Sequence, residues 1–194
     1  LVYKKYGNVG GNSEIRKEKW LDWWNKIGKF NLPQNFSPKK VYVPKINSDL
    51  AEFIGIMIGD GGMNKYQIGI SLNYKTDENY IIFVKDLINK IFKIKPAVYK
   101  REKQSMVNIV ISRVQLVKAL NLLGLKIGNK LKQDLDIPEW IKKDNKLMLA
   151  CIRGIIDTDG CVFNECHKIK EKVYCYPRLA LVSASKNLRL SVFT

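Results

Sequence analysis

The sequence has no apolar run long enough to span a bilayer, and no signal-peptide pattern opens it. We therefore expect a cytosolic or organelle-matrix protein without a membrane partner. Histidine is almost absent, since His167 is the only one among 194 residues. Any catalysis has to be explained without relying on a set of histidines.

The sequence also lacks a C-x-x-C pair, which tight structural zinc sites usually contain. Its four cysteines are Cys151, Cys161, Cys166 and Cys175, and three of them lie near His167 in sequence. Zinc binding by that cluster is the alternative, but we interpret the cysteines as ordinary strand and turn residues. Disulfides are not expected in a reducing compartment.

Acidic residues are scarce. There are 18 Asp and Glu against 34 Lys and Arg, a formal net charge of +16. Such an excess opposes compaction unless a polyanion uses it, so the charge favours nucleic-acid binding over a merely solvated basic surface. The hydrophobic fraction of 46% and the chain length suit a folded protein of one large domain or two small ones.

Residues 1–48 differ in composition from the rest and form a first region. Asn12 or Ser13 caps a predicted helix that ends near Gly28, and an extended linker follows it. The helix carries Trp20, Trp23 and Trp24, and the linker contains Pro33, Pro38 and Pro44. The tryptophans suit a DNA-stacking platform or, as more often happens, a small apolar face docked on a neighbour.

Residues 49–136 predict alternating helices and strands. Their expected elements are an apolar helix at 50–59, a half-buried strand at 66–73, an amphipathic helix at 76–92, a basic hairpin at 98–101 and 107–112, and a helix at 112–123 ended by Gly124. This layout is helix–strand–strand–helix–strand–strand–helix, which is an α+β series.

Residues 137–194 restart the same series. We expect a helical stretch from Pro138, a second apolar helix at 147–158, a long hairpin at 161–168 and 173–184, and a helix capped by Ser185. The sequence therefore predicts a tandem pseudo-two-fold repeat with a period near 100 residues. The second copy is incomplete, because counterparts of the later elements are missing.

The strongest signal is a pair of helix ends. Residues 53–61 read FIGIMIGDG and residues 152–160 read IRGIIDTDG. Both strings have Gly at the third place, a small residue at the seventh, Asp at the eighth and Gly at the ninth. Small residues four apart share one helical face and allow a close helix–helix contact. The ninth-place glycines, Gly61 and Gly160, are expected to turn the chain at positive φ.

The eighth-place acids are Asp60 and Asp159, which are 99 residues apart. A carboxylate at a helix C-terminus faces the negative end of the helix dipole, and two such groups side by side repel. A divalent cation between them resolves both problems, and Mg²⁺ (or Mn²⁺) suits an oxygen site shared with phosphates. The alternative is that each Asp-Gly is only a turn after a helix.

These strings resemble the LAGLIDADG motif of homing endonucleases. The resemblance covers roughly residues 49–190, including the stretch IPEWIKKDNKLMLACIRGIIDTDG that leads to the second motif. It implies two half-domains, 49–136 and a partial 137–194, each offering a curved antiparallel sheet to the DNA major groove. It also implies that Asp60 and Asp159 bind metal and cut both strands, and that Gly59 and Thr158 lend backbone carbonyls to the metal shell.

The resemblance implies a monomer with internal pseudo-two-fold symmetry that binds double-stranded DNA without an obligate protein partner. Family members often have a basic residue near the pocket, for which Arg113 is a candidate by location. We expect the sheet face away from the helices to contact DNA, because Gln, Asn, Arg, Lys and Ser suit base edges and phosphates. The candidates are Lys65, Gln67, Ser71, Asn73, Lys100, Arg101, Lys103, Asn108, Ser112 and Arg113.

Three other interpretations remain open. One is a non-cleaving DNA- or RNA-binding relative, such as an intron maturase or a transcription regulator. Another is an intein fragment, although no splicing-type Cys or Ser opens a block and no His-Asn pair closes one. The third is a basic scaffold protein, which leaves the paired Asp-Gly helix ends unexplained.

Overall fold

The computed structural model describes residues 13–31, 41–42 and 44–193, apart from the side chains of Ser13 and Leu131. The chain divides into two compact units, Leu1–Pro38 and Lys39–Thr194, and each is described by itself. In these ranges no helix has the length and apolarity that crossing a membrane requires.

The first unit contains the tryptophan helix. Helix α2 spans Ser13–Trp23 and continues as a π-helical turn, η1, at Trp24–Gly28. The predicted helix, including its end at Gly28, is confirmed. A Cβ atom on Gly28 would lie 2.7 Å from the Trp23 ring and 2.8 Å from the Trp24 ring, so the glycine allows both indoles to close over the backbone. Pro33 and Pro38, expected in the linker, lie outside the described residues.

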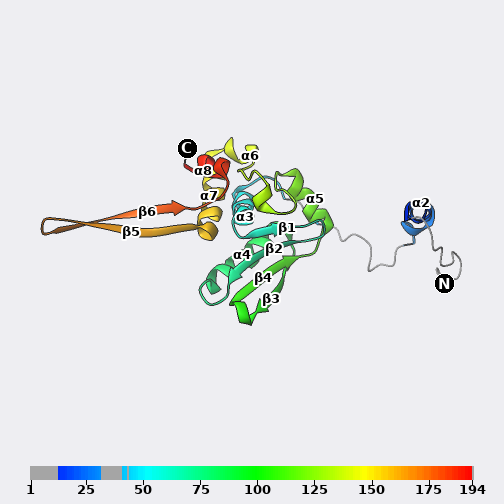
Figure 1. Ribbon diagram of the computed structural model, residues 1–194, viewed down its shortest axis with the longest axis horizontal. Helices are drawn as coiled ribbons and strands as arrows, with labels where there is room; N and C mark the ends of the chain where they lie inside the picture. The colour runs from blue at the N-terminus through cyan, green and yellow to red at the C-terminus, as the bar shows by residue number, and fades with distance from the viewer. Residues whose placement is uncertain (1–12, 32–40, 43, 194) are drawn as a thin grey trace. The chain divides into compact units, whose positions relative to one another are not determined.

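The second unit begins with a helix and a four-stranded antiparallel sheet in the order β1-β2-β4-β3 (Figure 1). The elements are α3 (Ser48–Ile58), β1 (Gly61–Met63), β2 (Ile68–Asn73), α4 (Glu78–Phe92), β3 (Ala97–Arg101), η3 (Glu102–Gln104), β4 (Met106–Ile111) and α5 (Val114–Leu122). The expected series is confirmed for these residues, but the strand predicted at 66–73 starts later, as β2 at Ile68. Tyr66 lies instead in a turn where its N–H donates to Asn64 Oδ1 at 2.8 Å, and its side chain is exposed.

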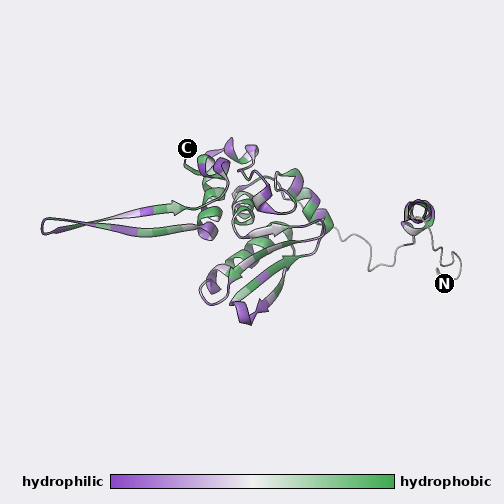
Figure 2. Ribbon diagram, in the orientation of Figure 1, coloured by the Kyte–Doolittle hydropathy of each residue, from purple (hydrophilic) through white to green (hydrophobic). Residues whose placement is uncertain are grey.

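The core lies between one face of this sheet and the helices. Alternate residues of β2 and β4 are buried, as the period-two pattern predicted: Ile68, Ile70, Leu72, Val107, Ile109 and Ile111. They join the apolar face of α4 and the apolar residues of α3 from Leu50 onward in one cluster. Figure 2 shows the contrast with the hydrophilic tip of the β3–β4 hairpin. The sheet therefore buries apolar side chains on one of its two faces only.

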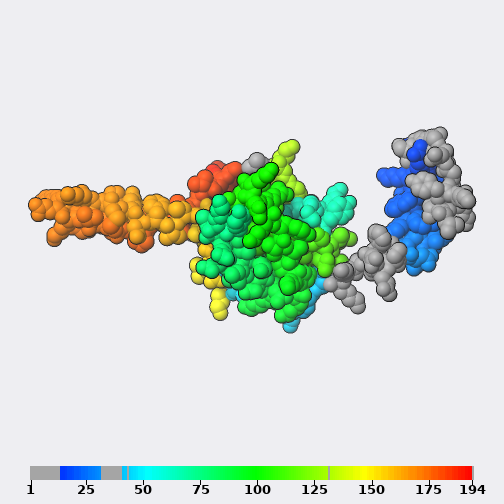
Figure 3. All heavy atoms as spheres, turned by 90° about the horizontal axis from the view of Figure 1, so that it is seen from below, coloured from blue at the N-terminus to red at the C-terminus, as the bar shows by residue number. Residues whose placement is uncertain are grey.

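The rest of the second unit has fewer strands. Its elements are η4 (Lys130–Lys132), α6 (Glu139–Lys142), α7 (Asn145–Asp159), β5 (Gly160–Ile169), β6 (Lys172–Leu181) and α8 (Lys186–Phe193). Within the described part of the chain, strands β5 and β6 pair only with each other, and they extend as an arm beyond the end of α7 (Figures 1 and 3). Most of their residues are exposed. The predicted helix after Ser185 is confirmed as α8.

Helices α3 and α7 touch through their glycines. A Cβ atom on Gly55 would lie 2.1 Å from the carbonyl oxygen of Cys151, and one on Gly154 would lie 2.3 Å from that of Glu52. The close contact predicted from the glycine spacing is confirmed. Beside this contact between the helices, the buried Glu52 carboxylate accepts hydrogen bonds from the Arg153 guanidinium, and the distance from Nε to Oε1 is 2.7 Å. This ion pair ties the two helices together.

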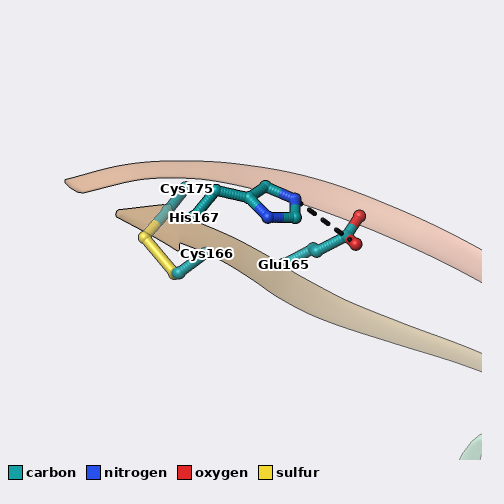
Figure 4. The surroundings of a disulfide bond; sticks show 4 residues. All are labelled: Glu165, Cys166, His167 and Cys175. Carbon is teal, nitrogen blue, oxygen red and sulfur yellow. Dashed lines mark ion pairs between the residues drawn. A yellow bond between two sulfur atoms is a disulfide. The ribbon is translucent and has the colours of Figure 1, made fainter. Parts of the chain in front are cut away.

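The cysteines depart from the expectation. Cys166 and Cys175 form a disulfide, with their Cα atoms 4.1 Å apart, so interpreting them as unpaired was wrong (Figure 4). They stand directly opposite each other in the β5–β6 register. That register, rather than the sequence spacing, brings the two sulfurs together. Cys151 is buried and Cys161 exposed, both as thiols.

Candidate active site

The two motif helices end side by side. Helix α3 stops at Ile58, and the Gly59 N–H donates to the Gly55 carbonyl at 3.0 Å. A Cβ atom on Gly59 would lie 1.9 Å from Thr158 Oγ1 and 3.5 Å from the carboxyl carbon of Asp159. The small seventh-place residue is therefore what lets the end of one helix reach the acid of the other. Asp60 and Asp159 lie close enough in the structure for Asp159 to raise the pKa of Asp60, although they are 99 residues apart in sequence.

The ninth-place glycines serve a different purpose from the one predicted. Gly160 has φ −96° and ψ 170°, which is extended backbone, and Gly61 is not among the glycines with positive φ. A Cβ on Gly61 would instead lie 2.4 Å from Met57 Cα, and one on Gly160 would lie 2.6 Å from the Ile156 carbonyl. Each glycine lets a strand leave its helix by folding back against the last helical turn.

Lys130 lies beside the motif acids and was not among the residues singled out from the sequence. Its Nζ donates to the carbonyl of Ile58 at 2.8 Å and also to that of Gly59. Burial lowers the pKa of Lys130, while the nearby Asp159 and Asp60 carboxylates oppose that shift. A positive charge thus lies beside both motif acids and holds the end of α3.

The two acids are electrostatically strained. Burial raises the pKa of Asp60 to about 6; the neighbouring Asp159 adds to the increase and Lys130 opposes it. Burial likewise raises the pKa of Asp159, again against the effect of Lys130. Asp60 is partly buried and Asp159 is exposed, so the electrostatic cost of ionising the pair falls mainly on Asp60.

Asp157, the sixth-place acid, belongs to a different neighbourhood. Burial and the Glu52 carboxylate raise its pKa, and the Arg153 guanidinium lowers it. It is thus coupled to the ion pair between the helices. It also provides a matched acid against which Asp60 and Asp159 can be tested.

The donor set suits a hard cation that keeps some of its waters. Among the described residues, no group of three or more His, Cys, Asp or Glu side chains is placed to hold a metal by itself. Two carboxylates and the main-chain carbonyl of Gly59 are oxygen donors of the kind Mg²⁺ accepts, with water or phosphate completing the shell. Gly59 was expected to contribute that carbonyl, which here accepts from Lys130. The Thr158 hydroxyl donates within its own helix, to Gly154 at 2.9 Å.

A pocket of about 520 Å³ opens beside Asp159. Three lysines line it, Lys130, Lys132 and Lys186, together with Asp134, Asp159, several small polar residues and apolar residues such as Leu135 and Leu188. A polyanion that enters it would meet positive charge next to the acid pair.

Four of the expected DNA-reading residues form one polar patch on the sheet. Ser71 Oγ donates to Asn108 Oδ1 at 2.8 Å across the β2–β4 register, and Ser112 Oγ donates to Gln67 Oε1 at 3.4 Å. Asn73 extends the same row along β2 and is exposed. The patch lies on the face opposite the buried Ile68, Ile70 and Leu72.

The basic hairpin is arranged differently from the expectation. Lys100 pairs with Val107, whose side chain is buried, so the register directs Lys100 toward the helix side, and its Nζ lies over the Tyr74 ring at 5.4 Å. The expectation that Lys100 lies on the outer face was wrong. Neighbouring residues of a strand point to opposite faces, and the pairing with β4 places Lys100 on the face of the buried Val107. Arg101 does share the face of Asn108, and so does Tyr99, an exposed residue that was not singled out.

The remaining candidates lie outside the strands. Lys65 lies in the turn before β2, Lys103 lies in η3, and both are exposed. Arg113 precedes α5, and its guanidinium donates to the Ser112 carbonyl at 2.8 Å. The basic residue beside the acids is Lys130 and not Arg113. The sequence indicates the turn that precedes Lys130 but does not indicate that its side chain reaches the acids. Gly128, at φ 110°, marks a tight turn just before Lys130.

Comparison with known proteins gives partial similarities. No protein-family model matches the chain. It is 30% identical over 120 residues to the replication factor C small subunit of Methanocaldococcus jannaschii, which is 57% of this chain and 6% of that protein. It is 27% identical over 124 residues to a component of the A-type ATP synthase of Pyrococcus abyssi, which is 63% of this chain and 12% of that protein. The chain therefore spans only a small part of these curated relatives.

Among solved structures, the chain is similar to one from a study of mesophilic variants of the homing endonuclease I-DmoI. The match has 16% identity and a TM-score of 0.39, and covers 69% of this chain and 83% of that one. A similarity this loose carries no argument about function. The α+β architecture with antiparallel sheets follows from the chain's own elements.

Proposed function

We propose that this protein is a site-specific, double-strand DNA endonuclease that holds a divalent metal ion between Asp60 and Asp159. The observation that supports this most is the meeting of two acids from distant, similar motifs beside Lys130, with carboxyl pKa values raised by burial. Paired carboxylates at the end of a tightly packed helix pair are costly to fold. A cation and a phosphate at that point would offset the cost.

In this proposal Asp60 and Asp159 bind Mg²⁺ or Mn²⁺, and the carbonyls of Gly59 and Thr158 are further candidate donors. When bound, the metal supplies positive charge that activates water and stabilises the leaving oxygen. Lys130 then holds the end of α3 through the Ile58 carbonyl and offers its charge to the scissile phosphate. No histidine or cysteine needs to take part.

DNA is the substrate that the surrounding surface fits. The +16 charge and the three lysines of the pocket would offer phosphate contacts. The polar patch of the sheet would offer hydrogen-bonding groups to base edges. We also infer that the series starting at α3 and at α7 are copies of one unit. Each motif helix leads directly through an Asp-Gly pair into an antiparallel hairpin.

The partial matches to two curated proteins support the interpretation of this chain as a self-contained module. Their names denote unrelated activities, and each matches over 12% or less of its own length. The two matches cover 57% and 63% of this chain, and because these shares together exceed its whole length, the matched segments overlap. A segment common to such different proteins is better explained as an inserted unit with its own activity than as part of either named function.

The test is cleavage of a plasmid library of random sequences by the full chain with Mg²⁺. We expect cutting at rare sites, loss of cutting in Asp60→Asn and Asp159→Asn, and retention in Asp157→Asn, which removes an acid from the same helix outside the pair. Lys130→Met is expected to cut more slowly by about tenfold or more. Undiminished cutting by both Asp60→Asn and Asp159→Asn would refute the metal assignment.

One observation favours a second candidate, a DNA- or RNA-binding protein that does not cleave. The Lys130 ammonium already donates to the Gly59 carbonyl and lies near both acids, so the chain partly neutralises its own site. This candidate predicts tight binding of the selected sites without strand breaks in Mg²⁺ or Mn²⁺. It also predicts that Asp60→Asn leaves affinity unchanged.

A further inference from the structure

Helix α2 carries charge of opposite sign on opposite faces. Arg16, Trp20 and Trp24 follow one another at intervals of four residues and so share a face. The acids Glu14, Glu18 and Asp22 form a second row with the same interval, displaced by two residues. Two residues of an α-helix correspond to about 200° of rotation, so the acidic row lies opposite the tryptophan row.

The tryptophan face presents a flat aromatic surface. The rings of Trp20 and Trp24 are stacked, with centroids 5.5 Å apart and planes within 9° of each other. Trp24 packs with Trp23 over Gly28, which anchors it, whereas Trp20 remains 53% exposed. The outer indole is thus held in a fixed orientation while much of its surface stays open to solvent.

Positive charge flanks this surface. Arg16 and Lys17 lie four and three residues before Trp20, on its side of the helix, and both are exposed. Lys26 lies on the other side, where its Nζ pairs with Asp22 at 2.8 Å. The face therefore combines an exposed indole with cations, and the acids are kept away from it.

We propose that this face of α2, made of Arg16, Lys17, Trp20 and Trp24, is a second nucleic-acid site that binds a single strand. Arg16 and Lys17 contact phosphates, and an unpaired base stacks on Trp20. Every base has a π face that stacks on an aromatic ring, so such binding tolerates any sequence. In a duplex the bases are already stacked on one another and closed to an indole. This site lies in the first unit and uses none of the residues of the proposed cleavage site.

The experiment measures binding of the full chain to a fluorescently labelled oligothymidylate and to a mixed-sequence duplex of equal length. Divalent metal is omitted, so that cleavage cannot interfere. We expect the single strand to bind, Trp20→Ala to weaken that binding by about tenfold, and Trp20→Phe to restore most of it. Lys17→Ala is expected to weaken it by about threefold, more than Lys26→Ala, which removes the same charge from the opposite face.

Three results would overturn the proposal. Unchanged single-strand affinity in Trp20→Ala would show that the ring does not contact the ligand. A loss of thermal stability in Trp20→Ala together with unchanged affinity would show that the face packs against protein instead. Equal losses in Lys17→Ala and Lys26→Ala would reduce the effect to bulk charge. Helix content of each variant is checked by circular dichroism, and Lys17→Ala preserves the test if Trp20→Ala fails to fold.

Discussion

The strands that follow α3 and those that follow α7 leave equivalent helix ends but have different surroundings. After α3 the chain builds a four-stranded sheet in which β2 and β4 bury alternate residues, and Ile109 on β4 is 1% exposed. After α7 it builds two strands, on which Val162 and Val173 are 68% and 63% exposed. Similar motifs therefore create the same helix contact without securing the same support for the strands beyond it.

The difference shows which contacts stabilise the second unit. The first sheet gains from burying alternate apolar side chains against helices, whereas an isolated two-stranded ribbon is only marginally stable in water. The β5–β6 arm has a disulfide in place of a core, and beside it His167 lies within ion-pair distance of Glu165 (Figure 4). The Glu165 carboxylate also pairs with the exposed Arg178. We expect the two regions to respond to perturbation on different scales.

The largest effect is expected where both regions depend on the same contact. Gly154→Val places side-chain atoms against the backbone of α3, where even a Cβ would lie 2.3 Å from the Glu52 carbonyl. We expect a loss of about 3 kcal/mol or more in the free energy of unfolding. Denaturant titration measures it, with Gly62→Ala as the control, because a Cβ there meets nothing within 4 Å. Equal stabilities would mean that α3 and α7 are not in contact.

The next comparison separates the two sets of strands directly. Ile109→Ala removes side-chain atoms from the buried face of β4 and should cost about 2–5 kcal/mol. Val173→Ala, on the exposed arm, should change the free energy of unfolding by less than about 0.5 kcal/mol. Thermal melts of both variants measure the contrast. A large effect at Val173 would show that the arm is covered in solution.

Reduction of the Cys166–Cys175 disulfide should affect the arm alone. The closed loop is short, with a sequence separation of 9, so the cross-link contributes about 2–3 kcal/mol to keeping these strands paired. After treatment with a dithiol we expect faster amide hydrogen exchange in β5 and β6 and unchanged exchange in β2 and β4. Cys161→Ser, which leaves the disulfide intact, is the control. Faster exchange throughout would contradict the independence of the two regions.

The smallest effect is a gain in stability from removing Asp60. Its pKa is raised to about 6, so the folded state disfavours the charged form, and stability falls as pH rises from about 4 to about 6. The shift corresponds to about 3 kcal/mol, and screening of a half-buried group reduces this to about 1 kcal/mol. Without divalent metal, Asp60→Asn should therefore melt at a higher temperature than the unaltered protein at pH near 7.5.

The same difference should shrink as the pH falls toward 4 and vanish below it, where Asp60 becomes protonated in both the folded and the unfolded state. Metal binding should weaken over the same range, because a protonated carboxyl is a poor ligand for Mg²⁺. Calorimetric titration with Mg²⁺ measures this at each pH. Lower stability of Asp60→Asn at neutral pH would mean that the acid has a structural role.

Much of the fold could be predicted because it depends on local pattern. Period-two burial in β2 and β4 and period-3.6 burial in α4 appear in the sequence as spacing. The positions of Lys100 and of the Cys166–Cys175 pair could not, because both depend on strand register. Lys130 was missed for a related reason: its loop reaches the carbonyl of Ile58, 72 residues away.

The sequence by itself determined the helix contact and the two acids, since glycine spacing and Asp-Gly ends are local and repeated. Only the tertiary structure decided what surrounds those acids. It placed Lys130 between distant segments, set Asp157 apart with Glu52 and Arg153, and used Gly61 and Gly160 for close packing rather than for positive φ. The physical reason is that burial and charge proximity, which raise the carboxyl pKa values, are properties of packing between segments that the chain order does not specify.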